Sequence, residues 1–170
     1  MNRIKSSSQD SGKKKAIILS IFGVLILAIG IYLFSNGKTN EPEQIVLGGK
    51  EVMVYKTPTC GCCNAYISYL KQKGVAVKSE NVENLNGTKR QYGVPTDLSS
   101  CHTSIVDGYV VEGHVPIEAI EKLLNERPNI KGIALPGMPS GTPGMPGPKN
   151  ETWDIRSFTE DGTTGTFMSI

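Results

Sequence analysis

The sequence predicts an α/β domain preceded by one N-terminal transmembrane helix. An uncharged apolar run at residues 16–34 is about as long as a helix that crosses the hydrocarbon layer. Between residues 51 and 127, short apolar runs typical of strands alternate with segments that have helical periodicity. Proline and glycine separate these segments from one another. The chain of 170 residues has room for one such domain beside the membrane helix.

The apolar run reads AIILSIFGVLILAIGIYLF, and its polar content is one serine and one tyrosine. Three lysines at 13–15 precede it, which predicts that residues 1–15 form a basic cytoplasmic tail. The remainder of the chain is then periplasmic or extracellular, held at the membrane by a single-pass anchor. A cleaved signal peptide is the alternative, although the run is longer than usual and GIYLFSNG lacks an A-x-A-like site. Both interpretations export the domain.

The charge distribution argues against a nucleic-acid partner. The formal net charge is +2, and several of the basic residues lie in the N-terminal tail, so the rest of the chain has no basic excess.

Residues 35–49 are largely polar with Gly, Asn and Pro, and they are expected to form a linker between the anchor and the domain at 50–170.

The order of predicted elements defines the domain. A strand is expected at 51–56, a helix at 64–73, a strand at 75–82 and a short helix at 85–92. Residues 103–112 predict a hairpin that turns at Asp107-Gly108. Pro116 suits the first turn of a helix that continues to Pro128, with a buried stripe. This β-α-β-α-β-β-α order is that of a thioredoxin-like domain.

The sequence changes character after Ile133. Two similar tetrapeptides, Pro136-Gly137-Met138-Pro139 and Pro143-Gly144-Met145-Pro146, predict a Gly/Pro/Met loop at 136–148. A final hairpin is expected from 152–159 and 163–170, turning at Asp161-Gly162.

All four cysteines lie in two short segments. Cys60, Cys62 and Cys63 form T-C-G-C-C between a predicted strand and helix, and Cys101 lies in S-C-H-T before the hairpin. A helix N-terminus lowers the pKa of a thiol and favours the thiolate, which binds metals and attacks disulfides. The position of the first segment is therefore typical of reactive cysteines.

Three interpretations of these cysteines are open. Two structural disulfides are usual for exported cysteines, but here they would require a strained short loop. Thiol–disulfide exchange would use Cys60 and Cys63 as a C-x-x-C pair, and Val94-Pro95-Thr96 resembles the loop whose proline is cis in such enzymes. A soft-metal site would use all four thiolates for Cu(I), with adjacent cysteines bridging several ions. We favour the copper site, because structural zinc prefers well-separated ligands.

Four further residues are candidate ligands. His102 follows Cys101 directly, and His114 lies at the turn into the last predicted helix. Either imidazole could bind the metal or support a ligand by hydrogen bonding. Met138 and Met145 lie in a Gly/Pro loop without a core stripe to join, and a thioether suits Cu(I).

Together these motifs resemble one family. T-P-T-C-G-C-C (57–63), V-P-T-D-L-S-S-C-H-T (94–103), G-Y-V-V-E-G-H-V-P (108–116) and G-M-P-S-G-T-P-G-M (137–145) are similar to CopG, the exported copper-resistance family rather than the repressor of that name. The resemblance covers about residues 50–170. It implies a thioredoxin-like envelope protein in copper tolerance, with Cys60, Cys62, Cys63 and Cys101 as metal ligands. The uncleaved-looking anchor departs from many relatives, which carry a cleavable export signal.

The sequence therefore predicts a membrane-anchored protein that binds copper, Cu(I) by preference, at a four-cysteine site with several ions. Sequestration, transfer to a protein partner and a Cu(I)/Cu(II) redox step could each use such a site. A thiol–disulfide oxidoreductase with Cys60 and Cys63 as its catalytic residues is the alternative, so whether the protein is an enzyme is left open.

Overall fold

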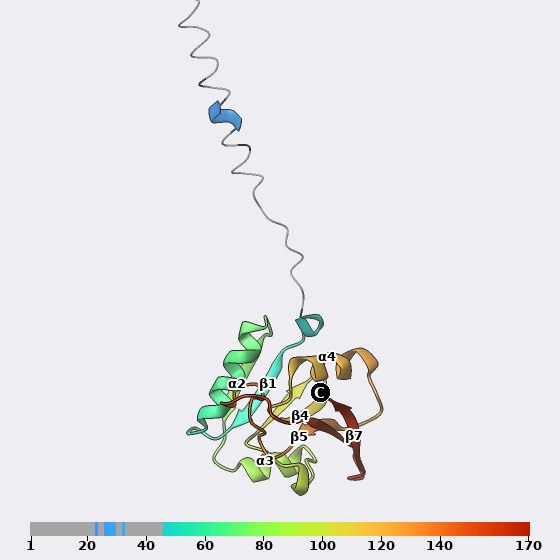
Figure 1. The fold of residues 1–170 in the computed structure, drawn as a ribbon. Helices are drawn as coiled ribbons and strands as arrows, with labels where there is room; N and C mark the ends of the chain where they lie inside the picture. Colours follow the sequence, from blue (N-terminus) through green and yellow to red (C-terminus); the bar gives the residue numbers. More distant parts are fainter. Residues whose placement is uncertain (1–22, 24–25, 30–31, 33–45) are drawn as a thin grey trace, which may run out of the picture. The chain divides into compact units, whose positions relative to one another are not determined.

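The computed structural model describes residues 46–170, together with Gly23, residues 26–29 and Tyr32 (Figure 1). The chain divides into two compact units, Met1–Glu43 and Gln44–Ile170. In the first unit the described residues are helical, and Ile26, Leu27 and Tyr32 are exposed. Most of the predicted anchor at 16–34, the whole tail at 1–15 and most of the linker lie outside the described residues. Within the part that is described, no helix is both long and apolar enough to span a membrane.

The second unit is built on one seven-stranded mixed sheet, whose strand order is β2-β1-β3-β4-β5-β6-β7 (Figure 1). β1 pairs in parallel with β2, and β4 pairs in parallel with β5, while the other neighbours are antiparallel. The strands are β1 (Val52–Lys56), β2 (Val77–Asn81), β3 (His102–Val106), β4 (Tyr109–Gly113), β5 (Gly132–Leu135), β6 (Asp154–Phe158) and β7 (Thr164–Ser169).

Helices cover both faces of this sheet. On one face, α2 (Gly61–Gln72) and α4 (Ile117–Glu126) contribute to the larger apolar core with residues of β1, β4, β5 and β6. On the other face, α3 (Leu85–Gln91) and the short 3-10 helix η2 (Thr96–Leu98) lie beside a smaller core. A second 3-10 segment, η1 (Val46–Gly49), leads into the domain. The small core consists of Val94, Leu98, Val110, Ala134 and Phe158.

The predicted order of strands and helices is confirmed from β1 to α4. The hairpin turns at Asp107-Gly108, where both residues have positive φ, 48° and 88°, as the favoured two-residue hairpin turn requires. The predicted turn at Asp161-Gly162 likewise lies between β6 and β7. Pro116 precedes α4 at its N-cap position instead of lying inside the first turn.

The start of one helix was predicted wrongly, and one strand was missed. The helix expected at 64–73 begins three residues earlier, at Gly61, because Cys60 caps it, so Cys62 and Cys63 belong to its first turn. The strand β5 was not predicted, since Gly132–Leu135 is too short to show alternation before Pro136. β5 pairs with both β4 and β6, and it joins the C-terminal hairpin to the central sheet.

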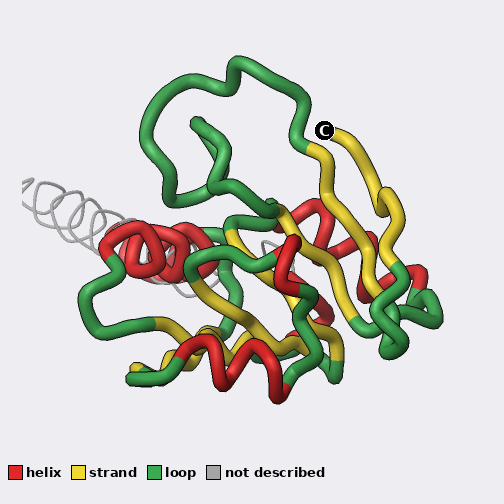
Figure 2. Tube along the Cα trace, turned by 90° about the horizontal axis from the view of Figure 1, so that it is seen from below, coloured by secondary structure: helices red, strands yellow, loops and turns green. Residues whose placement is uncertain are grey.

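The Gly/Pro/Met loop connects β5 to β6 (Figure 2). It turns back to the first turn of α2, where Gly144 lies so close that an added Cβ would be 2.6 Å from the Tyr66 nitrogen and 3.0 Å from the Cys62 oxygen. Its φ of +83° also favours glycine. The C-terminal extension therefore contributes directly to the surroundings of the cysteines.

Candidate metal and redox centre

The first three cysteines are held by the start of α2. Cys60 is the N-cap residue, and its Sγ accepts a hydrogen bond from the Cys63 N–H at 3.3 Å. Cys60 and Cys63 form a disulfide with their Cα atoms 5.4 Å apart, a usual separation for such a bond. Cys62, between them, is free. This arrangement places three sulfur atoms at the positive end of the helix dipole.

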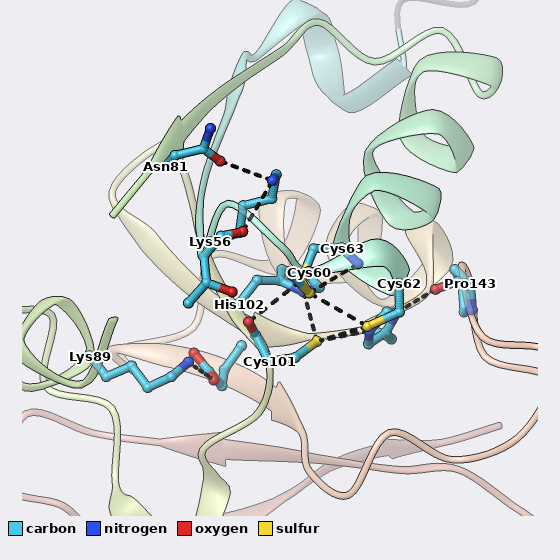
Figure 3. Close-up of a disulfide and its surroundings, with 12 residues drawn as sticks. Lys56, Cys60, Cys62, Cys63, Asn81, Lys89, Cys101, His102 and Pro143 are labelled. Carbon is cyan, nitrogen blue, oxygen red and sulfur yellow. Dashed lines mark hydrogen bonds and ion pairs between the residues drawn. A yellow bond between two sulfur atoms is a disulfide. The ribbon is translucent and has the colours of Figure 1, made fainter. Parts of the chain in front are cut away.

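Cys101 approaches from the other side of the site, out of the segment between η2 and β3 (Figure 3). Its Sγ lies 3.8 Å from that of Cys62, and the Cys62 Sγ lies 3.6 Å from that of Cys60. The four Sγ atoms all lie within 4.8 Å of one another. The structure thus brings together the four cysteines that the sequence places in two separate segments.

Both predicted histidines lie at the same site, and both are fully buried. Cys101 Sγ lies 3.0 Å from His114 Nε2 and 3.3 Å from His102 Nδ1. His114 Nδ1 lies 2.6 Å from the Pro143 carbonyl, which can only accept, so Nδ1 carries the proton. Nε2 of His114 therefore presents its lone pair to Cys101.

The two imidazole rings pack around Tyr66 of α2. The ring centroids of Tyr66 and His102 are 4.6 Å apart, and those of Tyr66 and His114 are 5.5 Å apart. The Tyr66 hydroxyl donates to the Val115 carbonyl at 2.8 Å, which fixes the phenol ring against the segment between β4 and α4. Nε2 of His102 is buried without a hydrogen-bond partner. The His102 nitrogen that lies at the sulfur cluster is Nδ1, 3.3 Å from Cys101 Sγ, and a neutral imidazole nitrogen is a common metal ligand.

Burial dominates the electrostatics of the centre. It raises the pKa of the Cys101 thiol to about 12, with a further contribution from the neighbouring Cys62 thiol. It also lowers the pKa of His102 well below its usual value, and the neighbouring His114 and Lys89 lower that pKa further. Burial lowers the pKa of His114 as well. In the metal-free protein the histidines are consequently neutral at pH 7, which is the form that binds metals.

The two methionines of the Gly/Pro/Met loop differ in exposure. Met138 is exposed at 40%, and Met145 is half-buried beside Gly144, the residue that contacts the first turn of α2. Ligation by either thioether remains a prediction. The expected cis-proline loop is not present: the Val94–Pro95 bond is trans, and Pro95 directly precedes η2.

Sequence reasoning missed a buried polar network behind Cys101. Glu112 of β4 is fully buried and forms an ion pair with Lys89 of α3, which is also buried. Thr103 Oγ1 donates to Glu112 Oε2 at 2.7 Å, and the Ser100 N–H donates to Glu112 Oε1 at 2.6 Å. The available signal was a single glutamate in the otherwise apolar strand Y-V-V-E-G. Lys56, buried before the first cysteine segment, was missed too.

Comparisons with known proteins agree with this geometry. A glutaredoxin family model matches residues 52–93, and a family of unknown function, DUF411, matches residues 98–145. The glutaredoxin match confirms the thioredoxin-like fold that the element order predicts. No curated protein matches the chain.

Two solved structures are similar over most of the domain. "Copper resistance protein copG- Form 2" is 35% identical, with a TM-score of 0.67, and the match covers 71% of this chain and 98% of that one. "Copper resistance protein copG- Form 1" is 36% identical, with a TM-score of 0.66, over 71% of this chain and 96% of that one. The identity, the coverage and the four-cysteine cluster together show that this chain belongs to the CopG family of copper resistance proteins.

Proposed function

We propose that the protein binds copper, as Cu(I) by preference, through Cys60, Cys62, Cys63 and Cys101, and that it contributes to copper tolerance. The observation that carries this proposal is the convergence of four sulfur donors within 4.8 Å. Copper is here the cargo, or the substrate, of the site. Membership of a family whose solved relatives are called copper resistance proteins supports the same assignment.

The chemistry of the donor set fits a soft metal. Thiolates select Cu(I), and the two buried imidazoles beside Cys101 are also donors that copper accepts. No carboxylate belongs to either group of convergent donors that the described residues form. A hard cation such as Mg²⁺ or Ca²⁺ requires oxygen ligands and would be poorly bound here.

Several copper ions fit this arrangement better than one. Cys62 and Cys63 are adjacent in sequence, which makes it difficult for both to chelate one ion, whereas thiolates can bridge two ions. Binding through all four sulfurs requires that the Cys60–Cys63 disulfide be reduced first. The reduced protein is therefore the copper-binding form in this proposal.

The proposal includes a location. The apolar run at 16–34, the lysines before it and the exposed apolar side chains at Ile26 and Leu27 support a membrane anchor with its N-terminus in the cytoplasm. The domain would then lie in the periplasm or outside the cell. Labelling Cys62 with a membrane-impermeant maleimide in intact cells tests this. If the reagent can cross the outer layers of the cell envelope, labelling of Cys62 only after cell lysis would contradict this location.

The copper proposal is tested by an anaerobic Cu(I) titration of the reduced full chain in mild detergent, against a competing chromophoric chelator. Wild type should withdraw Cu(I) from the chelator. Replacing Cys60, Cys62 and Cys63 together by serine should abolish tight binding, while the circular dichroism spectrum stays unchanged. Tight binding that survives this triple replacement would show that the ligand assignment is wrong.

A second candidate function rests on the disulfide itself. Cys60 and Cys63 form a C-x-x-C disulfide at a helix N-terminus in a region that matches glutaredoxin. A thiol–disulfide oxidoreductase would transfer two electrons from this dithiol to a substrate disulfide, which becomes two thiols. This activity should need Cys60 and Cys63 but tolerate Cys101→Ser. Loss of activity in Cys101→Ser would instead favour a shared four-sulfur site.

A further inference from the structure

We infer that Glu112 is a positioning residue for the metal site: its carboxylate, fixed by Lys89 and Thr103, holds the backbone of Ser100 and thereby sets where the Cys101 sulfur lies. This inference deepens the proposed function and rests on it where copper is concerned. Within residues 46–170 the hydrogen-bond partners of the Glu112 carboxylate are Lys89, Ser100 and Thr103, and none is a cysteine sulfur, so its role is exerted through Ser100.

The first step is the burial of the carboxylate. Glu112 is 0% exposed, at the register position opposite Thr103 of β3. It lies on the same face of β4 as Val110, the face that α3 covers. Lys89 reaches it from α3 and is itself 5% exposed. Removing two charges from water has a large desolvation cost, so a buried ion pair is weak evidence for stability and needs another explanation.

The second step is what the carboxylate holds. Glu112 Oε1 accepts the Ser100 N–H at 2.6 Å, and Oε2 accepts the Thr103 hydroxyl at 2.7 Å. Lys89 Nζ donates to Glu112 Oε1 and also to Thr103 Oγ1 at 3.1 Å. A hydrogen bond to an ionised acceptor is about twice as strong as a neutral one. The network therefore ties residues on both sides of Cys101 to one carboxylate.

Gly113, next to Glu112, packs closely against Ser100. The neighbouring Gly113, with a φ of +79°, would place an added Cβ 2.8 Å from Ser100 Cβ. A side chain at 113 would therefore push Ser100 away. Cys101, the next residue, is consequently held 3.0 Å from His114 Nε2 and 3.8 Å from Cys62 Sγ.

A pair of matched double variants isolates the Ser100 contact. Lys89→Met/Glu112→Gln removes both charges and keeps an acceptor oxygen for the Ser100 N–H. Lys89→Met/Glu112→Met removes both charges and the acceptor, at similar side-chain volume. If Glu112 positions Cys101, the glutamine variant should behave like wild type and the methionine variant should not.

Two readouts separate positioning from mere stability. In the metal-free full chain with the Cys60–Cys63 disulfide intact, iodoacetamide should alkylate Cys101 of the methionine variant at least about five-fold faster than that of the glutamine variant. In the reduced chain, the methionine variant should bind fewer Cu(I) ions per chain in chelator competition. Equal alkylation rates and equal copper binding in the two variants, whatever their melting temperatures, would overturn the inference.

The alkylation readout requires no copper, so it decides the inference even if wild type fails to bind Cu(I), which would overturn only the proposed function. Should the methionine variant fail to fold, amide hydrogen exchange in wild type decides instead. The Ser100 amide should then exchange at least about 100-fold more slowly than the Gly61 amide at an exposed position. Exchange at a similar rate would overturn the inference.

Discussion

The two cysteine segments are held in different ways. In the segment that opens α2, the interactions are local: Cys60 caps the helix and its Sγ accepts the N–H of Cys63, three residues later. Around Cys101 the interactions are long-range: Cys101 contacts His114, which follows β4, and the preceding Ser100 is held by Glu112 of β4, which pairs with Lys89 of α3. One half of the site is thus formed by a helix start and the other half by tertiary packing. Changes far from the metal ligands should therefore affect mainly the second half.

The largest effect is expected from removing the carboxylate behind Cys101. Glu112→Ala leaves Lys89 buried without its partner, which should lower the free energy of unfolding by about 3–5 kcal/mol. Urea denaturation of the metal-free protein measures this. Glu126→Ala, which breaks the exposed pair with Lys122, is the matched control and should cost only about 0.5 kcal/mol. Similar losses in the two variants would contradict the long-range support of the second segment.

A glycine substitution tests whether the first cysteine segment, at the start of α2, depends on its contact with the Gly/Pro/Met loop. Gly144→Ala combines backbone strain of about 1–2 kcal/mol with a clash against α2 that costs roughly 1–3 kcal/mol more. Gly137→Ala is the matched control, because its φ of +78° is similar and no atom lies within 4 Å of the added Cβ. Thermal unfolding of both variants isolates the contact. If they unfold alike, the Gly/Pro/Met loop does not support α2.

The free energy of unfolding should depend on pH through the second cysteine segment, because both histidines contact Cys101. Burial lowers the pKa of each in the folded state, whereas in the unfolded chain each has a value of about 6.5. Below that pH the unfolded state binds protons that the folded state excludes. Each histidine then reduces stability by about 1.4 kcal/mol per pH unit until its folded pKa is reached.

NMR titration of the metal-free protein checks this directly. The imidazole resonances of His102 and His114 should each titrate with a midpoint below the usual value of about 6.5, because burial lowers both pKa values. Resonances that titrate with a midpoint at or above 6.5 would show that burial does not control these groups.

The smallest change in stability is expected in the first segment. Serine is a good N-cap residue, so under reducing conditions Cys60→Ser should alter the free energy of unfolding by about 0.5 kcal/mol or less. Chelator competition with the same variant should nevertheless show weaker Cu(I) binding. A large loss of stability would mean that Cys60 does more for the fold than cap α2.

This contrast also explains what the sequence could predict. The order of elements from β1 to α4 and the hairpin at Asp107-Gly108 follow from local periodicity and turn chemistry, and they are confirmed. The cysteine cluster followed from the strand–loop–helix pattern together with the family resemblance. The beginning of α2 was placed three residues too late, because a cysteine N-cap is not among the usual signals.

The features that were missed depend on tertiary contacts. β5 is only four residues long, and it becomes a strand because β4 and β6 pair with it on both sides. Glu112 and Lys89 are 23 residues apart in sequence, and nothing in either local pattern indicates that the two are partners. The unpaired Nε2 of His102 is likewise visible only once Tyr66 has packed over the ring.

The central claim is that both segments bind the same copper ions. The most direct test is an anaerobic Cu(I) titration of the reduced full chain, comparing wild type with Cys101→Ser. Wild type should bind more than one Cu(I) per chain tightly, and Cys101→Ser should lose this binding although the first segment keeps all three of its cysteines. A Cys101→Ser protein with the stoichiometry and affinity of wild type would contradict the claim and confine the metal site to the start of α2.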